Sequence, residues 1–127
     1  MLQQFAVVAI GGALGAMARF AVYTHLPVGK SSVLPWPTLC VNVGGSFIAG
    51  LLLVWLSQAH PEAVGWRLLG MVGFLGAFTT FSAFSVDTWL LIEAGRWGHA
   101  LLNASLNLSL SVAACVGGVF LARGLAA

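Results

Sequence analysis

The chain has 127 residues, of which 60% are hydrophobic and only 6% are charged. A soluble domain carries about 25% charged residues, so this chain has too few to cover a surface that faces water. Its five basic residues are scattered and form no basic run, which excludes a nucleic-acid-binding surface. We therefore expect the surface of the protein to face lipid.

A transmembrane helix needs about 20 apolar residues, so a chain of this length allows about four crossings and no soluble domain beside them. We predict an all-α membrane protein with a single domain over residues 1–127. Because the residues before Phe5 contain no basic segment, we expect the first span to be retained rather than cleaved as a signal peptide. The expected spans are 5–26, 38–56, 66–94 and 98–122.

The first two spans each combine small residues with one conspicuous polar side chain. Gly11 and Gly15 have the small-xxx-small spacing that lets membrane helices approach closely. Arg19 follows within the same span, and it either reaches the interface or belongs to a pathway inside the bundle. In the second span, Asn42 and Ser46 lie on one helical face. Asn42 either joins helices by hydrogen bonds or serves a functional site.

The third span contains the stretch GFLGAFTTFSAFS at residues 73–85, which does not favour one continuous helix. Glycines weaken the helical backbone, and the hydroxyls of Thr79, Thr80 and Ser82 compete for backbone hydrogen bonds. The span is also longer than one straight crossing requires. We therefore predict a third helix that is broken at its centre.

The chemistry near this break favours a small anion over a cation. A break inside a membrane exposes backbone amides and carbonyls, and hydroxyls and amides can hold an anion. The electropositive ring edges of Phe81 and Phe84 can also face an anion. The fourth span adds a polar stripe made of Asn103, Asn107 and Ser111.

The basic residues give almost no preferred orientation in the membrane. With an even number of spans, Arg67 and Arg123 lie on one side, and Lys30 and Arg96 lie on the other. A chain without an orientation preference can insert both ways. Pairing of the two orientations predicts an antiparallel, dual-topology homodimer.

Four stretches of the sequence resemble the Fluc (CrcB) family of fluoride channels. They are GGALGAMAR at residues 11–19, TLCVN ending at Asn42, the 73–85 stretch, and ALLNASLNLSLS in the fourth span. The resemblance implies a fluoride-selective channel that exports cytoplasmic fluoride by passive electrodiffusion and gives resistance to fluoride toxicity. It also implies a dual-topology dimer with two pores in the bacterial inner membrane.

The same resemblance implies roles for particular residues. Phe81 and Phe84 would line the fluoride path, and the backbone carbonyls of Gly76 and Thr79 would hold a structural Na⁺ at the dimer centre. Asp87 stands where the family has glutamate, which leaves its role open. The full set expected along the fluoride path is Asn42, Thr80, Phe81, Ser82, Phe84, Asn103, Asn107 and Ser111.

Two other kinds of membrane protein have to be weighed against a channel. A small proton-coupled multidrug exporter would need a titratable carboxylate, ordinarily in the first span, and this span has none. A non-transporting assembly subunit would carry no flux at all. An enzyme is not expected, because no nucleophile–base pair or metal-ligand cluster is apparent in the sequence.

Overall fold

The computed structural model describes residues 1–26, 29, 32–59 and 63–126. Within this part of the chain all regular structure is helical. Four helical stretches are long and apolar enough to cross a membrane, namely Leu2–His25, Trp36–Gln58, Val64–Glu93 and Trp97–Ala126. The prediction of an all-α protein with four such helices is confirmed, and the ends differ from those expected by one to four residues.

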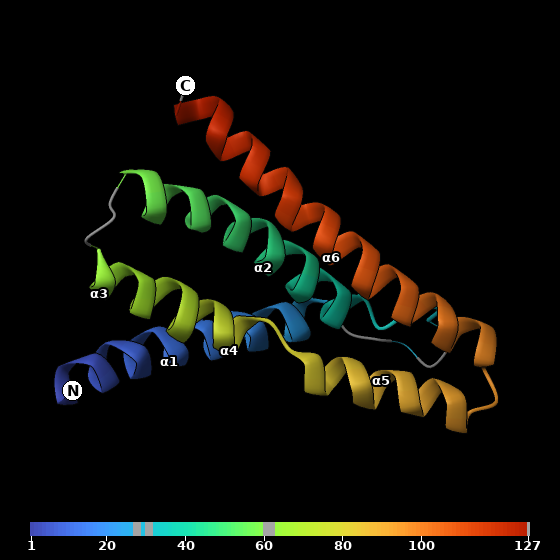
Figure 1. The fold of residues 1–127 in the computed structure, drawn as a ribbon. Coiled ribbons are helices and arrows are strands. Elements are labelled where there is room, and N and C mark those ends of the chain that lie inside the picture. Colours follow the sequence, from blue (N-terminus) through green and yellow to red (C-terminus); the bar gives the residue numbers. More distant parts are fainter. Residues whose placement is uncertain (27–28, 30–31, 60–62, 127) are drawn as a thin grey trace.

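The first and third stretches pack together through glycine. Helix α1 (Leu2–His25) lies along the segment formed by α3 (Val64–Trp66), the π-helical η2 (Arg67–Leu75) and α4 (Gly76–Phe78) (Figure 1). A Cβ atom on Gly11 or Gly15 would clash with the backbone of this segment, and one on Gly73 would clash with α1. The small-xxx-small spacing of the first span therefore serves close helix packing.

The second and fourth stretches form the other tight pair. Helix α2 (Trp36–Val54), continued by the π-helical η1 (Trp55–Ala59), runs beside α6 (Trp97–Ala126) (Figure 1). Gly50 and Gly118 face the opposite backbone here, because a Cβ on either would overlap a main-chain oxygen of the other helix. The start of α1, the end of α6, and η1 and α3 lie toward the same end of the bundle (Figure 1).

Helical structure is interrupted between α4 and α5 (Phe81–Glu93). Thr79 and Thr80 both have extended backbone angles, with ψ of 158° and 118°. Thr80 then acts as the N-cap of α5, and its hydroxyl accepts a hydrogen bond from the Ala83 amide. The hydroxyl residue at this position thus starts a new helix after the two extended residues.

A glycine turn reverses the chain between α5 and α6. Gly95 has a φ of +73°, a conformation that glycine adopts without the penalty of a Cβ. The Gly95 amide donates to the Ile92 carbonyl and the Arg96 amide donates to the Leu91 carbonyl, which is the Schellman pattern. The Arg96 guanidinium also donates to the Ser32 carbonyl, so this turn is joined to the segment before α2.

Many large apolar side chains lie on the outside of the bundle, including Phe5, Met17, Trp89 and Leu108. In water such a surface would be unfavourable, and in lipid it is the ordinary outer surface of a membrane bundle. The interior instead contains polar side chains. Among the most buried residues are Thr38, Thr80, Asn103 and Asn107.

Candidate functional site

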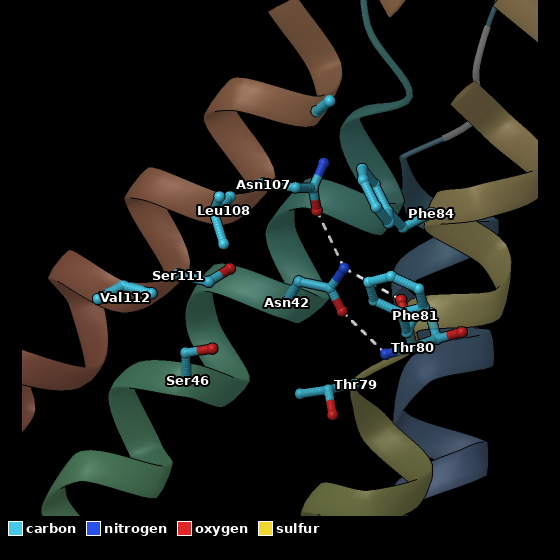
Figure 2. A pocket seen from close by; sticks show the side chains of 11 residues that line it. Asn42, Ser46, Thr79, Thr80, Phe81, Phe84, Asn107, Leu108, Ser111 and Val112 are labelled. Carbon is cyan, nitrogen blue, oxygen red and sulfur yellow. Dashed lines mark hydrogen bonds between the residues drawn. The ribbon is translucent and has the colours of Figure 1, made fainter. Parts of the chain in front are cut away.

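A cavity of about 460 Å³ lies between α2, α6 and the extended residues that precede α5. Its wall has no charged side chain and combines hydroxyls, amides and aromatic rings with aliphatic groups (Figure 2). The residues that line it are Asn42, Ser46, Thr79, Thr80, Phe81, Phe84, Ala104, Asn107, Leu108, Ser111 and Val112.

Asn42 replaces the helical hydrogen bond that the Thr80 amide lacks at the interruption, and it also donates to the Thr80 carbonyl. Its Oδ1 accepts from the Thr80 amide at 2.8 Å, and its Nδ2 donates to the Thr80 carbonyl at 3.1 Å (Figure 2). Non-helical backbone at membrane depth is tolerated only where protein or water satisfies it. The Asn42 side chain therefore stabilises the extended conformation of Thr80.

The three membrane-level asparagines form a continuous chain of hydrogen bonds. Asn42 Nδ2 also donates to Asn107 Oδ1 at 3.0 Å, and Asn107 Nδ2 donates to Asn103 Oδ1 at 3.0 Å. Asn103 Nδ2 in turn donates to Thr88 Oγ1 on α5 at 2.9 Å. Asn42 therefore joins α2 to α6, and the same side chain lines the cavity.

Phe81 and Phe84 lie on the first turn of α5, at the cavity wall. Their ring centroids are 5.3 Å apart and the ring planes are tilted by 59°, within the range of distances over which aromatic rings attract each other. Phe84 is half-buried, whereas 78% of Phe81 is exposed in one copy of the chain. Phe81 therefore stands at the open side of the cavity.

Ser111 offers the clearest free hydrogen-bonding group in the cavity. Its Oγ is buried and has no hydrogen-bond partner among the described residues. It faces the same space as Ser46 and Asn42 on α2 (Figure 2). A buried hydroxyl without a partner is unfavourable in an empty apolar site, so this position is suited to a polar ligand or water.

Most of the residues predicted for the fluoride path are brought together, but three predicted site residues lie elsewhere. Asn42, Thr80, Phe81, Phe84, Asn107 and Ser111 share the cavity, as does Thr79. Asn103 is completely buried behind Asn107, and Ser82 lines a neighbouring cavity with its Oγ 3.2 Å from Thr80 Oγ1. Gly76, the first residue of α4, is exposed and lines neither space.

The neighbouring cavity, of about 590 Å³, differs from the first because charged side chains line its wall. Its wall includes Arg19 and Tyr23 of α1 and Asp87 of α5, and Thr80 belongs to both cavities. Behind it, Thr38 Oγ1 donates to Asp87 Oδ2 and is 2.7 Å from the Tyr23 hydroxyl. The sequence interpretation missed Thr38, although its position four residues before Asn42 extends the polar face of the second span.

Comparison with known proteins gives an independent account of the chain. The family described as CrcB-like protein, Camphor Resistance (CrcB), matches residues 6–119. The chain is 44% identical to the "Fluoride-specific ion channel FluC" of Magnetococcus marinus over 94% of this chain and 98% of that protein. It is 45% identical to "Fluoride-specific ion channel FluC 2" of Symbiobacterium thermophilum, over 84% of this chain and 87% of that protein.

A third relative, the FluC of Idiomarina loihiensis, is 43% identical over 96% of this chain and 91% of its own length. These alignments cover all four apolar helices rather than one shared motif. Together with the four helices, they identify a multi-pass membrane protein. The chain belongs to the CrcB family.

Proposed function

We propose that this protein is a fluoride-selective ion channel that lets cytoplasmic fluoride leave the cell by passive electrodiffusion. The observation that carries the proposal is the uncharged cavity beside the helix interruption, with its hydroxyls, amides and aromatic rings. The names of the relatives support the same ion, because the Magnetococcus and Symbiobacterium proteins are both called fluoride-specific ion channels. These names describe channels and not enzymes.

The cavity suits a small anion that has lost most of its water. The unpartnered Ser111 hydroxyl can donate to the ion, and the ring edges of Phe81 and Phe84 carry positive partial charge. The wall has no fixed cation that would trap the ion too tightly for conduction. Aliphatic side chains such as Leu108 and Val112 make up the rest of the wall and offer no hydrogen bond to an ion.

We infer that Val64–Glu93 is a single crossing interrupted at its centre and that the working channel is an antiparallel, dual-topology homodimer with two pores. The extended residues Thr79 and Thr80 support the first inference. The exposure of Phe81 at the open side of the cavity supports the second, because another copy of the chain would complete the wall there. The nearly even charge of the two loop sides favours insertion in both orientations.

A structural Na⁺ at the dimer centre fits two backbone carbonyl oxygens that have lost their helical hydrogen bonds. The Thr80 amide, which would close a helical turn on the Gly76 carbonyl, donates to Asn42 instead. The Ala83 amide, which would close a turn on the Thr79 carbonyl, donates to the Thr80 hydroxyl. We propose that these two carbonyls hold the ion, which would supply fixed positive charge at the symmetry axis. Thermal stability that is equal in Na⁺ and in N-methylglucamine would argue against this site.

We place the channel in the inner membrane of a bacterial cell, where it gives resistance to fluoride toxicity. Hydrogen fluoride enters from acidic surroundings, dissociates at neutral pH, and leaves fluoride trapped inside. A negative membrane potential then drives the anion outward through the pore. The protein would need no energy source beyond this potential.

The proposal is tested with purified protein in liposomes loaded with either potassium fluoride or potassium chloride. After addition of a potassium ionophore, a fluoride electrode should report rapid efflux, and a chloride electrode should report none above that of empty liposomes. Absence of fluoride efflux, or equal efflux of chloride, would refute the assignment.

A further inference from the structure

Helix α5 is held in one copy of the chain by few apolar contacts. Leu91 is its only buried residue, and its large side chains Phe81 and Trp89 are mostly exposed. Burial of apolar surface therefore does little to fix the rotation of this helix within the bundle. Since α5 carries both phenylalanines of the cavity, some other set of contacts has to set their position.

A chain of hydrogen bonds joins α5 to α2 and α1. Thr38 Oγ1 donates its only proton to Asp87 Oδ2, so the Tyr23 hydroxyl, 2.7 Å away, has to be the donor in its contact with Thr38. The order is therefore Tyr23 to Thr38 to Asp87, with an acceptor-only carboxylate at the end. Thr38 is 1% exposed, so no water competes for its hydroxyl.

Two neighbouring residues of α2 thus hold α5 at two points. Asn42 binds the backbone of Thr80 at the start of the helix, and Thr38, one turn earlier on α2, binds Asp87. The two points on α5 lie about two helical turns apart. Phe81 and Phe84 both lie on the segment between them.

We propose that Thr38 and Asp87 are positioning residues for ion conduction: their hydrogen bond fixes the orientation of α5 and thereby places the rings of Phe81 and Phe84 at the cavity. The inference rests on the proposed channel function. Neither residue lines the cavity that contains the phenylalanines, so both act through the helix and not on the ion in that cavity.

The acceptor oxygen of Asp87, and not its charge, is the feature that the chain of hydrogen bonds requires. Arg19 lines the same neighbouring cavity, but the Asp87 carboxylate is bonded to the neutral hydroxyl of Thr38. Asparagine at this position keeps an oxygen that can accept from Thr38, whereas leucine does not. The two substitutions therefore separate the geometric role from an electrostatic one.

The experiment compares fluoride efflux from liposomes for T38V, T38S, D87N and D87L with that of the unchanged protein. Valine keeps the shape of threonine without the hydroxyl, and we expect T38V and D87L to lower the efflux rate by at least about fivefold, the effect of losing one buried hydrogen bond. T38S and D87N should stay within about threefold of the unchanged rate, because each retains the bond. Thr24→Val is the matched control, since the Thr24 hydroxyl is exposed and bonds the Ala21 carbonyl of its own helix.

Amide hydrogen exchange provides a readout that does not depend on conduction. In T38V, peptides from α5 should exchange faster than in the unchanged protein, while those from the second half of α6 should not change. If the unchanged protein conducts no fluoride, the proposed channel function is refuted. The hydrogen exchange of α5 in T38V still tests whether the hydrogen-bond chain holds this helix. Unchanged efflux in T38V, failure of T38S to restore it, equal loss in D87N and D87L, or unchanged exchange in α5 would each overturn the proposal.

Discussion

The side chain of Asn42 connects the local structure of the interruption with the chemistry of the cavity. Its amide satisfies both polar groups of the Thr80 backbone and also donates to Asn107. The sequence shows an asparagine within an apolar span, and that is sufficient to mark the position as important. It does not show the partners, because they lie 38 and 65 residues further along the chain.

Replacement of Asn42 by leucine should destabilise the protein and abolish fluoride efflux. The change leaves the buried Thr80 amide without its partner, at a cost of about 1–3 kcal/mol, whereas the Thr80 carbonyl, as the N-cap carbonyl of α5, keeps the first bond of that helix. Thermal unfolding in detergent measures the first effect and liposome efflux the second. A melting temperature equal to that of the unchanged protein would show that the Thr80 backbone does not depend on Asn42.

Replacement of Ser111 by alanine should slow fluoride efflux several-fold and leave stability unchanged. The Ser111 hydroxyl has no hydrogen-bond partner among the residues that the structure describes, so its loss breaks no bond seen there, but it removes a donor from the cavity wall. The matched control is Ser109→Ala on the same helix, because the Ser109 hydroxyl is exposed and bonds the Ser105 carbonyl. Equal efflux from both variants would remove Ser111 from the ion path.

At the scale of helices, hydropathy predicts the spans well and the interruptions less well. The expected ends lie close to those observed because long apolar runs and interfacial tryptophans mark them. The sequence does not indicate the nine-residue π-helical segment η2. A π-helix has the same apolar residues as an α-helix, and η2 packs against α1, so its wider turn depends on a partner that is distant in the sequence.

Two adjacent glycines of α6, Gly117 and Gly118, test how closely α2 and α6 pack. A Cβ on Gly118 would clash with the Phe47 carbonyl oxygen, whereas one on Gly117 meets nothing within 4 Å. We expect Gly118→Ala to lower the stability by about 1–3 kcal/mol, as overpacking of a tight contact does. Gly117→Ala should be neutral, and equal melting temperatures in detergent would contradict this close contact between the two helices.

At the scale of the whole molecule, the apolar outer surface and the nearly even loop charges support the proposed insertion in either direction. The sequence suffices for this inference because it depends on counting basic residues on each side of the membrane. The pairing of two copies depends on surface shape, for which the sequence gives no direct signal. The open cavity beside Phe81 indicates where that pairing would occur.

Dual insertion predicts that a residue at the end of a span, such as Ser57 in η1, faces the outside in about half of the molecules and the inside in the others. A variant with Cys40 and Cys115 replaced by serine and a single cysteine at Ser57, which is exposed, can be labelled with an impermeant maleimide. In sealed vesicles about half of the protein should react, and the remainder only after the vesicles are opened. Labelling that is complete or absent before opening would show a single orientation.

The central claim is selective, uncoupled fluoride conduction, and the reversal potential of the purified protein in a planar bilayer tests it most directly. With equal chloride on both sides and a tenfold fluoride gradient, the current should reverse at the fluoride equilibrium potential, about 59 mV in magnitude for a monovalent ion. A pH gradient should not move this value. Reversal near zero would contradict fluoride selectivity, and a shift with pH would contradict passive conduction.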